Sequence, residues 1–203
     1  MIDQPSPEIP LSGSPPRTPP WGQEVVRLSP ELADRIEARP GARQEAVLVL
    51  GAGGAFAPDL LHVLLREGSA AVIGLDLQLS YRVEGVIYRA VDLCDESALR
   101  AFLLELGSIL EARGLALGTV YDLATTQTSP RGDRSRERLS AGKEGLLRAL
   151  CELPGDVRLF FMSTAEVYGA PEGAPYREDH IQQPFNPYGQ QKRREEKLIL
   201  SSH

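Results

Sequence analysis

Residues 46–57 read AVLVLGAGGAFA, an apolar run that ends in a glycine-rich turn. An unbroken run of apolar residues is typical of a strand that is buried on both faces. Leucines at helical spacing follow the turn, namely Leu60, Leu61, Leu64 and Leu65. The stretch therefore predicts a buried strand, a tight turn and an amphipathic helix in direct succession.

The same alternation of apolar runs and helical segments continues to the end of the sequence. Further strands are expected at 71–75, 86–91, 119–123 and 158–162, and helices at 57–67, 97–113, 138–152 and 188–200. Alternating strands and helices favour right-handed crossovers on a parallel sheet. We therefore predict an α/β fold, a Rossmann-type doubly wound parallel sheet with its ligand at the carboxyl ends of the strands.

Residues 1–44 differ in composition from this pattern. The first 21 residues contain seven prolines, which remove backbone donors and disfavour helix. Ser29 followed by Pro30 is typical of a helix start, so a short helix is expected to about Arg39. We predict a disordered lead with a short helix over 1–44 and a folded domain over 45–203.

Composition narrows the classes of function. The 203 residues carry a formal net charge of −6 and contain no basic run, which argues against nucleic acid or anionic lipid as a partner. No apolar stretch approaches the roughly 18 residues of a membrane span, and the N-terminus lacks signal-peptide features. Cys94 and Cys151 are too few for a disulfide framework and lack the spacing of a zinc site. We expect a cytoplasmic protein that acts on a small molecule, with no metal and no membrane association.

The turn after the first strand has the composition of a dinucleotide site. With Gly51, Gly54 and Ala57 at intervals of three, the backbone can bend and approach a pyrophosphate, and the next helix offers free N–H groups. Asp76 ends the second strand, where a carboxylate accepts from ribose hydroxyls and repels a 2′-phosphate, which favours NAD over NADP. The alternatives are a purely structural turn and, for Asp76, an ordinary helix cap.

Four further segments are similar to blocks of a known family. Residues 91–95 read VDLCD, residues 121–125 read YDLAT, and residues 161–169 read FMSTAEVYG. Residues 186–192 read NPYGQQK, a Tyr-x-x-x-Lys helix start. In this order, and after the glycine-rich turn, the segments resemble the extended short-chain dehydrogenase/reductases, the NAD-dependent epimerases and dehydratases. The resemblance covers residues 46–203 and implies an NAD(P)-binding Rossmann domain over 45–203, with NAD as the cofactor and a nucleotide sugar as the substrate.

The resemblance also implies cofactor contacts at the strand ends. Asp92 would accept a hydrogen bond from the adenine amino group, with Leu93 beside the cofactor, and Ala124 would line a ribose. The residues alone leave Asp92 open as a cap for the following helix, although Asp95 is better placed for that role.

Tyr188 and Lys192 are four residues apart, so on a helix they share one face. An ammonium close to a phenol favours the phenolate, which allows Tyr188 to take a proton from a substrate hydroxyl. By resemblance, both residues would also contact the cofactor, Thr164 would hydrogen-bond the same hydroxyl, and Glu166 would lie near the sugar ring. The alternatives are an exposed Tyr/Lys helix face and a solvated Glu166.

The sequence departs from the family pattern close to these residues. Asp122 stands where the family has His, and Leu139, Gly142 and Lys143 stand where it has an Asn ahead of a Gly-Thr pair. In the family, this Asn helps to connect the Tyr-Lys pair with solvent through water. By resemblance, its absence predicts that Tyr188 and Lys192 exchange protons with solvent less efficiently. The loop 126–138, which either meets a diphosphate or remains solvated, carries four arginines: Arg131, Arg134, Arg136 and Arg138.

Family members continue beyond the Tyr-Lys helix, whereas the resemblance breaks off directly after it, at residues 200–203. We expect the C-terminal strands and substrate lobe to be lacking, which leaves 158–162 as an apolar sheet edge. A homo-oligomer, or association with a chain that supplies the lobe, is expected. The predicted function is that of an NAD-dependent nucleotide-sugar epimerase/dehydratase, which transfers a hydride between a sugar carbon and nicotinamide with Tyr188 as the acid/base. We expect this chain alone to show little of that activity. The alternative is a non-catalytic NAD-binding or partner-binding module, or an inactive fragment of such an enzyme.

Overall fold

The computed structural model describes residues 43–79, 81–125, 134–170 and 175–202, and its centre is a sheet of five parallel strands. The strands are β1 (Arg43–Leu50), β2 (Ser69–Asp76), β3 (Ile87–Ala90), β4 (Ala116–Asp122) and β5 (Arg158–Phe161). They lie in the order β3-β2-β1-β4-β5, so the chain winds outward from β1 to one edge and then crosses to β4 on the other side of β1. The reversal between β1 and β4 is a topological switch point, where open α/β sheets bind ligands.

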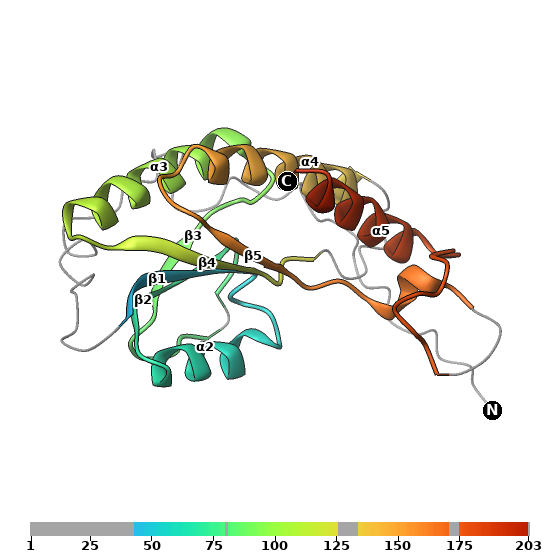
Figure 1. Ribbon diagram of the computed structural model, residues 1–203, viewed down its shortest axis with the longest axis horizontal. Helices are drawn as coiled ribbons and strands as arrows, with labels where there is room; N and C mark the ends of the chain where they lie inside the picture. The colour runs from blue at the N-terminus through green and yellow to red at the C-terminus, as the bar shows by residue number, and fades with distance from the viewer. Residues whose placement is uncertain (1–42, 80, 126–133, 171–174, 203) are drawn as a thin grey trace, which may run out of the picture.

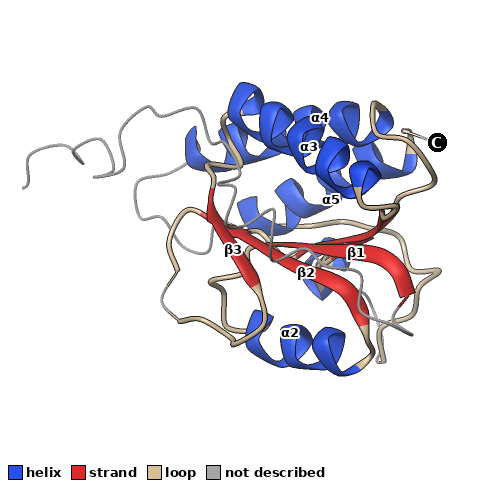
Figure 2. Cartoon of the chain, turned by 90° about the vertical axis from the view of Figure 1, so that its left-hand side faces the viewer, coloured by secondary structure: helices blue, strands red, loops and turns tan. Residues whose placement is uncertain are grey.

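Helices cover both faces of the sheet (Figures 1 and 2). Helix α2 (Ala57–Arg66) packs against one face, while α3 (Glu96–Ala112), α4 (Arg134–Cys151) and α5 (Pro187–Leu200) lie over the other. The short 3-10 helix η1 (Ala165–Tyr168) follows β5 and contacts α5. This arrangement confirms the predicted Rossmann-type doubly wound sheet.

Two apolar cores fill the space between the layers. On the α3 and α4 side the core includes Leu48 and Phe102, and on the α2 side it includes Val49 and Leu61, all fully buried. Successive side chains of a strand point to opposite faces of the sheet. Because both faces of β1 are covered, the run 46–50 is apolar at every position.

Each strand and helix predicted from residue 46 onward is present, with boundaries that differ by a few residues. The largest difference is at α4, which begins at Arg134, so Arg138 is helical and not part of a loop. The predicted disordered lead and its short helix, Arg131, and the side chains of Arg134 and Arg136 lie outside the described residues. Within the described ranges, no helix is both long and apolar enough to cross a membrane.

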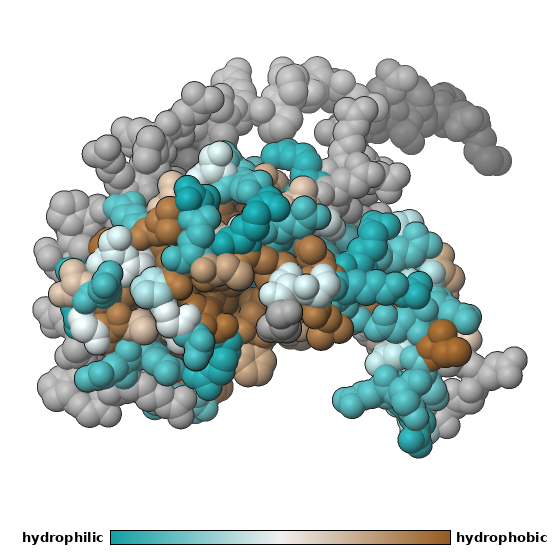
Figure 3. Space-filling view, turned by 45° about the horizontal axis from the view of Figure 1, so that its top comes forward, coloured by the Kyte–Doolittle hydropathy of each residue, from teal (hydrophilic) through white to brown (hydrophobic). Residues whose placement is uncertain are grey.

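Strand β5 lies at an edge of the sheet and carries exposed apolar side chains, as the sequence predicted. Phe160 is 54% exposed and stacks on Tyr121 of β4, with 5.0 Å between ring centroids. Met162, directly after the strand, is 41% exposed. A second apolar area lies in the middle of the face formed by the helices over the sheet (Figure 3). A separate hollow between the C-terminal ends of α4 and α5 is lined by Leu147, Leu150, Cys151, Gly155, Asp156, Val157, Leu159, Ile199 and Ser202.

Candidate functional site

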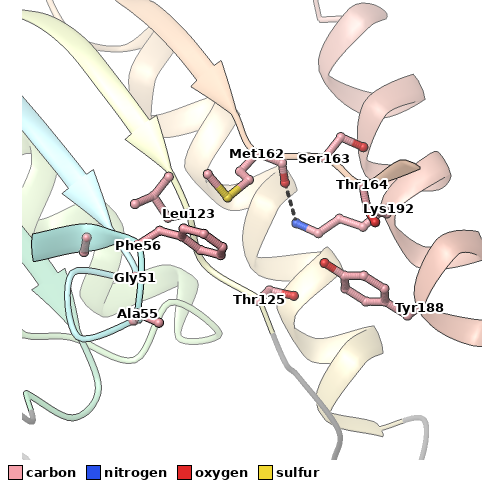
Figure 4. A pocket seen from close by; sticks show the side chains of 12 residues that line it. Gly51, Ala55, Phe56, Leu123, Thr125, Met162, Ser163, Thr164, Tyr188 and Lys192 are labelled. Atoms are coloured by element: carbon pink, nitrogen blue, oxygen red, sulfur yellow. Dashed lines mark hydrogen bonds between the residues drawn. The ribbon is translucent and has the colours of Figure 1, made fainter. Parts of the chain in front are cut away.

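A cavity of about 470 Å³ opens at the carboxyl ends of β1, β4 and β5. Ligand pockets usually occupy about 300–1,000 Å³. Side chains from the glycine-rich turn, from the ends of β4 and β5 and from α5 converge on it (Figure 4). The lining residues are Gly51, Gly54, Ala55, Phe56, Ala57, Leu123, Thr125, Met162, Ser163, Thr164, Tyr188 and Lys192.

The glycine-rich turn is shaped by close approaches to neighbouring loops. Gly51 has φ +77°, and a Cβ there would lie 2.8 Å from the backbone nitrogen of Ala124. Any other residue would be strained at this position and would push the loop after β4 away from the cavity. Ala57 is 1% exposed and packs α2 onto the sheet, the role expected of a small residue in the third place of the motif.

Asp76 fixes the turn from the end of β2. One carboxylate oxygen accepts a hydrogen bond from the Gly53 N–H at 2.8 Å, and the other accepts from the Gln78 N–H at 3.2 Å. A Cβ at Gly53 would overlap the Gln78 carbonyl oxygen, so this glycine, which the predicted motif passes over, is also required. The Tyr81 hydroxyl lies 2.9 Å from the Ala52 carbonyl oxygen and 2.6 Å from that of Gly54. Sequence reasoning missed Gly53 and Tyr81 because their partners come from a loop whose path no local pattern predicts.

A second cavity of about 260 Å³ continues from the first along the carboxyl ends of the strands, toward β2 and β3. It shares Gly51, Gly54, Leu123 and Thr125 with the first cavity. It is also lined by Asp76, Asp92, Leu93 and Ala124, the remaining predicted cofactor contacts. Together the two cavities form one cleft across the topological switch point.

Asp92 lies in this second cavity with both carboxylate oxygens engaged. One accepts from the Cys94 N–H at 2.9 Å, and the other lies 3.4 Å from the guanidinium of Arg138 on α4. The cap of α3 is Asp95, whose side chain accepts from the Ala98 N–H at 3.0 Å. Burial and the neighbouring Asp92 raise the pKa of the Cys94 thiol to about 11, so this cysteine lines the cleft as a neutral thiol at pH 7.

Thr164 lies at the other end of the cleft as the N-cap of η1, and Glu166 lies within η1. The Thr164 hydroxyl oxygen accepts from the Glu166 N–H at 3.3 Å and lines the first cavity. Glu166 is exposed, does not line either cavity, and accepts a hydrogen bond from the amide of Asn186, the N-cap of α5. A Cβ at Gly189 would lie 2.6 Å from the Glu166 carbonyl oxygen, so this glycine lets the first turn of α5 approach η1. The carboxylate of Glu166 therefore orients the start of the helix that carries Tyr188.

Tyr188 and Lys192 line the same cavity from the first two turns of α5 (Figure 4). Lys192 is 1% exposed; its ammonium donates to the Met162 carbonyl oxygen at 2.9 Å and lies 4.4 Å from the centroid of the Phe161 ring. Burial lowers the pKa of Lys192, and the nearby carboxylate of Glu195 opposes that shift.

The residues that depart from the family pattern form a buried ion pair. The Lys143 ammonium donates to Asp122, and the two side chains are 4% and 0% exposed. A Cβ at Gly142 would overlap the Leu93 carbonyl oxygen, so the adjacent glycine allows α4 to approach the loop after β3. Leu139, in the place of the family's Asn, is 6% exposed and lines the second cavity. In this segment Leu139 therefore packs against the second cavity, Gly142 allows α4 to approach the loop after β3, and Lys143 supplies the charge that pairs with Asp122.

The cleft fits a dinucleotide on two observations. The glycine-rich turn at Gly51 meets the backbone of Leu123 and Ala124 with no room for a Cβ, and the Thr125 hydroxyl is buried there without a hydrogen-bond partner although it lines both cavities. Buried hydroxyls rarely stay unpaired, so Thr125 is suited to a ligand polar group. Phe56 and Met162 also line the first cavity. No sequence pattern predicts them as site residues, because their position depends on how the glycine-rich turn and the end of β5 lie relative to each other.

Comparisons with known proteins agree with this geometry. Residues 47–203 match the NAD-dependent epimerase/dehydratase family. A UDP-glucose 4-epimerase of Azospirillum brasilense is 32% identical over 171 residues, which are 83% of this chain and 46% of that protein.

Solved structures show the same fold. A short-chain dehydrogenase/reductase superfamily protein from Agrobacterium tumefaciens with bound NAD has a TM-score of 0.59 at 28% identity, over 76% of this chain and 44% of that one. UDP-glucose 4-epimerase from Brucella ovis in complex with NAD has a TM-score of 0.62 at 22% identity, over 77% of this chain and 47% of that one. The chain thus spans about half the length of the relatives it matches.

Proposed function

Because the chain belongs to the NAD-dependent epimerase/dehydratase family, we propose that it binds NAD in the two-cavity cleft and uses Tyr188 as the acid/base of a nucleotide-sugar reaction. The observation that carries the proposal is the convergence of Thr164, Tyr188 and Lys192 on the cavity that the glycine-rich turn also lines. These side chains come from the segment that joins β5 to η1 and from α5, more than a hundred residues after the turn. Their meeting at the switch point matches the place where α/β sheets bind ligands.

The proposed chemistry divides between the cofactor and the chain. NAD supplies the hydride acceptor for the sugar carbon. Tyr188 takes the proton of the sugar hydroxyl, Lys192 favours the phenolate by its charge, and Thr164 hydrogen-bonds the hydroxyl to align it. Glu166 acts from outside the cavity by holding Asn186 at the start of α5. The relatives' names make a UDP-hexose the first substrate to test.

We expect the chain to bind NAD more tightly than NADP, because the Asp76 carboxylate in the second cavity would repel a 2′-phosphate. Asp76→Ala is expected to reduce that preference and also to weaken NAD binding, since it removes the acceptor for the Gly53 N–H. Isothermal titration calorimetry with each dinucleotide measures both effects. Glu84→Ala, an exposed acid outside the cleft, is the matched control for net charge. Equal affinities for the two dinucleotides in the unaltered chain would contradict the assignment of Asp76.

We also propose that the chain associates through its apolar surfaces, and we expect light scattering to detect species larger than a monomer. Phe160 and Met162 expose apolar area at the sheet edge, and burying such area contributes about 25 cal/mol per Å². Phe160→Ser should shift the population toward monomer. Phe185→Ser, at a loop residue that is 72% exposed, controls for the loss of an exposed phenylalanine elsewhere. If Phe160→Ser and its control leave the same distribution as the unaltered chain, the β5 edge is not the contact.

A further inference from the structure

Helix α5 carries a carboxylate that is buried as deeply as the lysine one turn before it. Glu195 is 1% exposed. One of its oxygens accepts from the Ser140 hydroxyl on α4 at 3.0 Å and from the Gln191 amide at 2.8 Å. Its other oxygen is buried without a hydrogen-bond partner and lies 3.6 Å from the Lys192 ammonium. Glu195 itself does not line either cavity of the cleft.

An isolated buried carboxylate is so unfavourable that it normally takes up a proton. Around Glu195, two donors point at one carboxylate oxygen and the Lys192 ammonium faces the other, so the buried carboxylate has polar partners on both sides. Burial is equally unfavourable for the charge of Lys192, whose ammonium lies close to the Phe161 ring and the Met162 carbonyl oxygen. Each group therefore stabilises the charge of the other.

Three other titratable groups surround Lys192. Lys143 and Asp122 act on it with opposite signs, but they are paired with each other, so their fields at Lys192 largely offset. Tyr188 lies on the cavity side of Lys192 and is the group that the ammonium is proposed to act upon. Of the two carboxylates that act on Lys192, Glu195 is the one not already paired with another cation.

We propose that Glu195 is a positioning residue of this site: its buried carboxylate, held by Ser140 and Gln191, keeps Lys192 in the ammonium form from outside the cavity. The inference rests on the proposed function, because it gives Lys192 the charge that favours the Tyr188 phenolate. Glu195 touches neither the cleft nor a ligand in it, and it acts through Lys192 alone. The charge state of the pair can be measured without cofactor or substrate.

The sequence makes the measurement unusually direct, because it contains only three lysines: Lys143, Lys192 and Lys197. In the chain labelled with lysine carrying ¹³C at the ε carbon, NMR resolves one titration for each, and Lys197→Arg helps to assign them. We expect Glu195→Gln to lower the pKa of Lys192 by roughly one to three units, the effect of removing an opposite charge at this distance. Glu144→Gln, an exposed acid on α4, should leave the Lys192 titration unchanged.

Identical Lys192 titrations in the unaltered chain and in folded Glu195→Gln would overturn the inference, whether or not NAD binds. If the chain binds no NAD, the proposed function fails instead, and the lysine titration still decides the role of Glu195. If Glu195→Gln does not fold, the double variant Glu195→Gln/Lys192→Met decides. Recovery of folding in the double variant supports the pairing, and a double variant that also fails to fold overturns it.

Discussion

Replacing Tyr188 by Phe is expected to reduce turnover about 100- to 10,000-fold in any preparation that converts a nucleotide sugar, because it removes the proposed general acid/base. The tyrosine hydroxyl projects into the cavity from the first turn of α5, near Lys192 (Figure 4). The ring itself remains in Tyr188→Phe, so the cavity wall and NAD affinity should change little. Steady-state rates on UDP-hexoses, together with NAD calorimetry, separate the loss of proton transfer from a loss of binding.

Tyr121→Phe is the matched control, since Tyr121 stacks on Phe160 and is outside both cavities. It should retain the unaltered rate. If Tyr188→Phe keeps near-normal turnover, another group moves the proton and the proposed mechanism is wrong. A chain that binds NAD but converts no sugar, even when joined to the C-terminal half of a relative, would favour the non-catalytic binding module.

Much of the fold was predictable because its signals are local. The run 46–50 is apolar at every position since both faces of β1 are covered, and the positive φ at Gly51 is a demand that glycine meets best. Most of the residues predicted for the site line the cleft, because parallel strands bring their carboxyl ends to one edge of the sheet. The cleft is lined by residues at the ends of all five strands for this reason.

The remaining features depend on contacts that no spacing reveals. The place of Glu166 near a sugar ring stays a prediction, and no spacing reveals that its carboxylate accepts a hydrogen bond from Asn186 outside the two cavities. Glu195 belongs to a run of charged residues that looks like a solvated helix face, but α4 covers it. Asp122 and Lys143 depart from the family pattern in two separate segments, and only the packing of α4 on the sheet makes them a pair. Each of these roles is set by how one helix lies against its neighbours.

The pair of Asp122 and Lys143 leads to the largest expected effect on stability. Removing one partner of a buried ion pair leaves an uncompensated charge and typically costs about 3–5 kcal/mol, a large part of a domain stability of about 5–15 kcal/mol. We therefore expect Lys143→Met and Asp122→Asn each to lower the free energy of unfolding substantially, measured by urea denaturation. Asp122→Asn keeps an acceptor for the Ala124 N–H, which lies 3.2 Å from the aspartate oxygen, so its cost reports the charge.

The double variant Asp122→Asn/Lys143→Met separates an ion pair from two independent packing contributions. Replacing both partners of a buried pair is often neutral or stabilising, so the double variant should recover most of the stability that either single change removes. Such recovery is a coupling that independent sites, whose effects simply add, do not show. It would mean that Asp122, in place of the family's His, and Lys143, in place of its Thr, form one co-adapted contact between β4 and α4. If the two single costs add in the double variant, the charges do not compensate each other, and the contact is no more than a chance approach of two side chains.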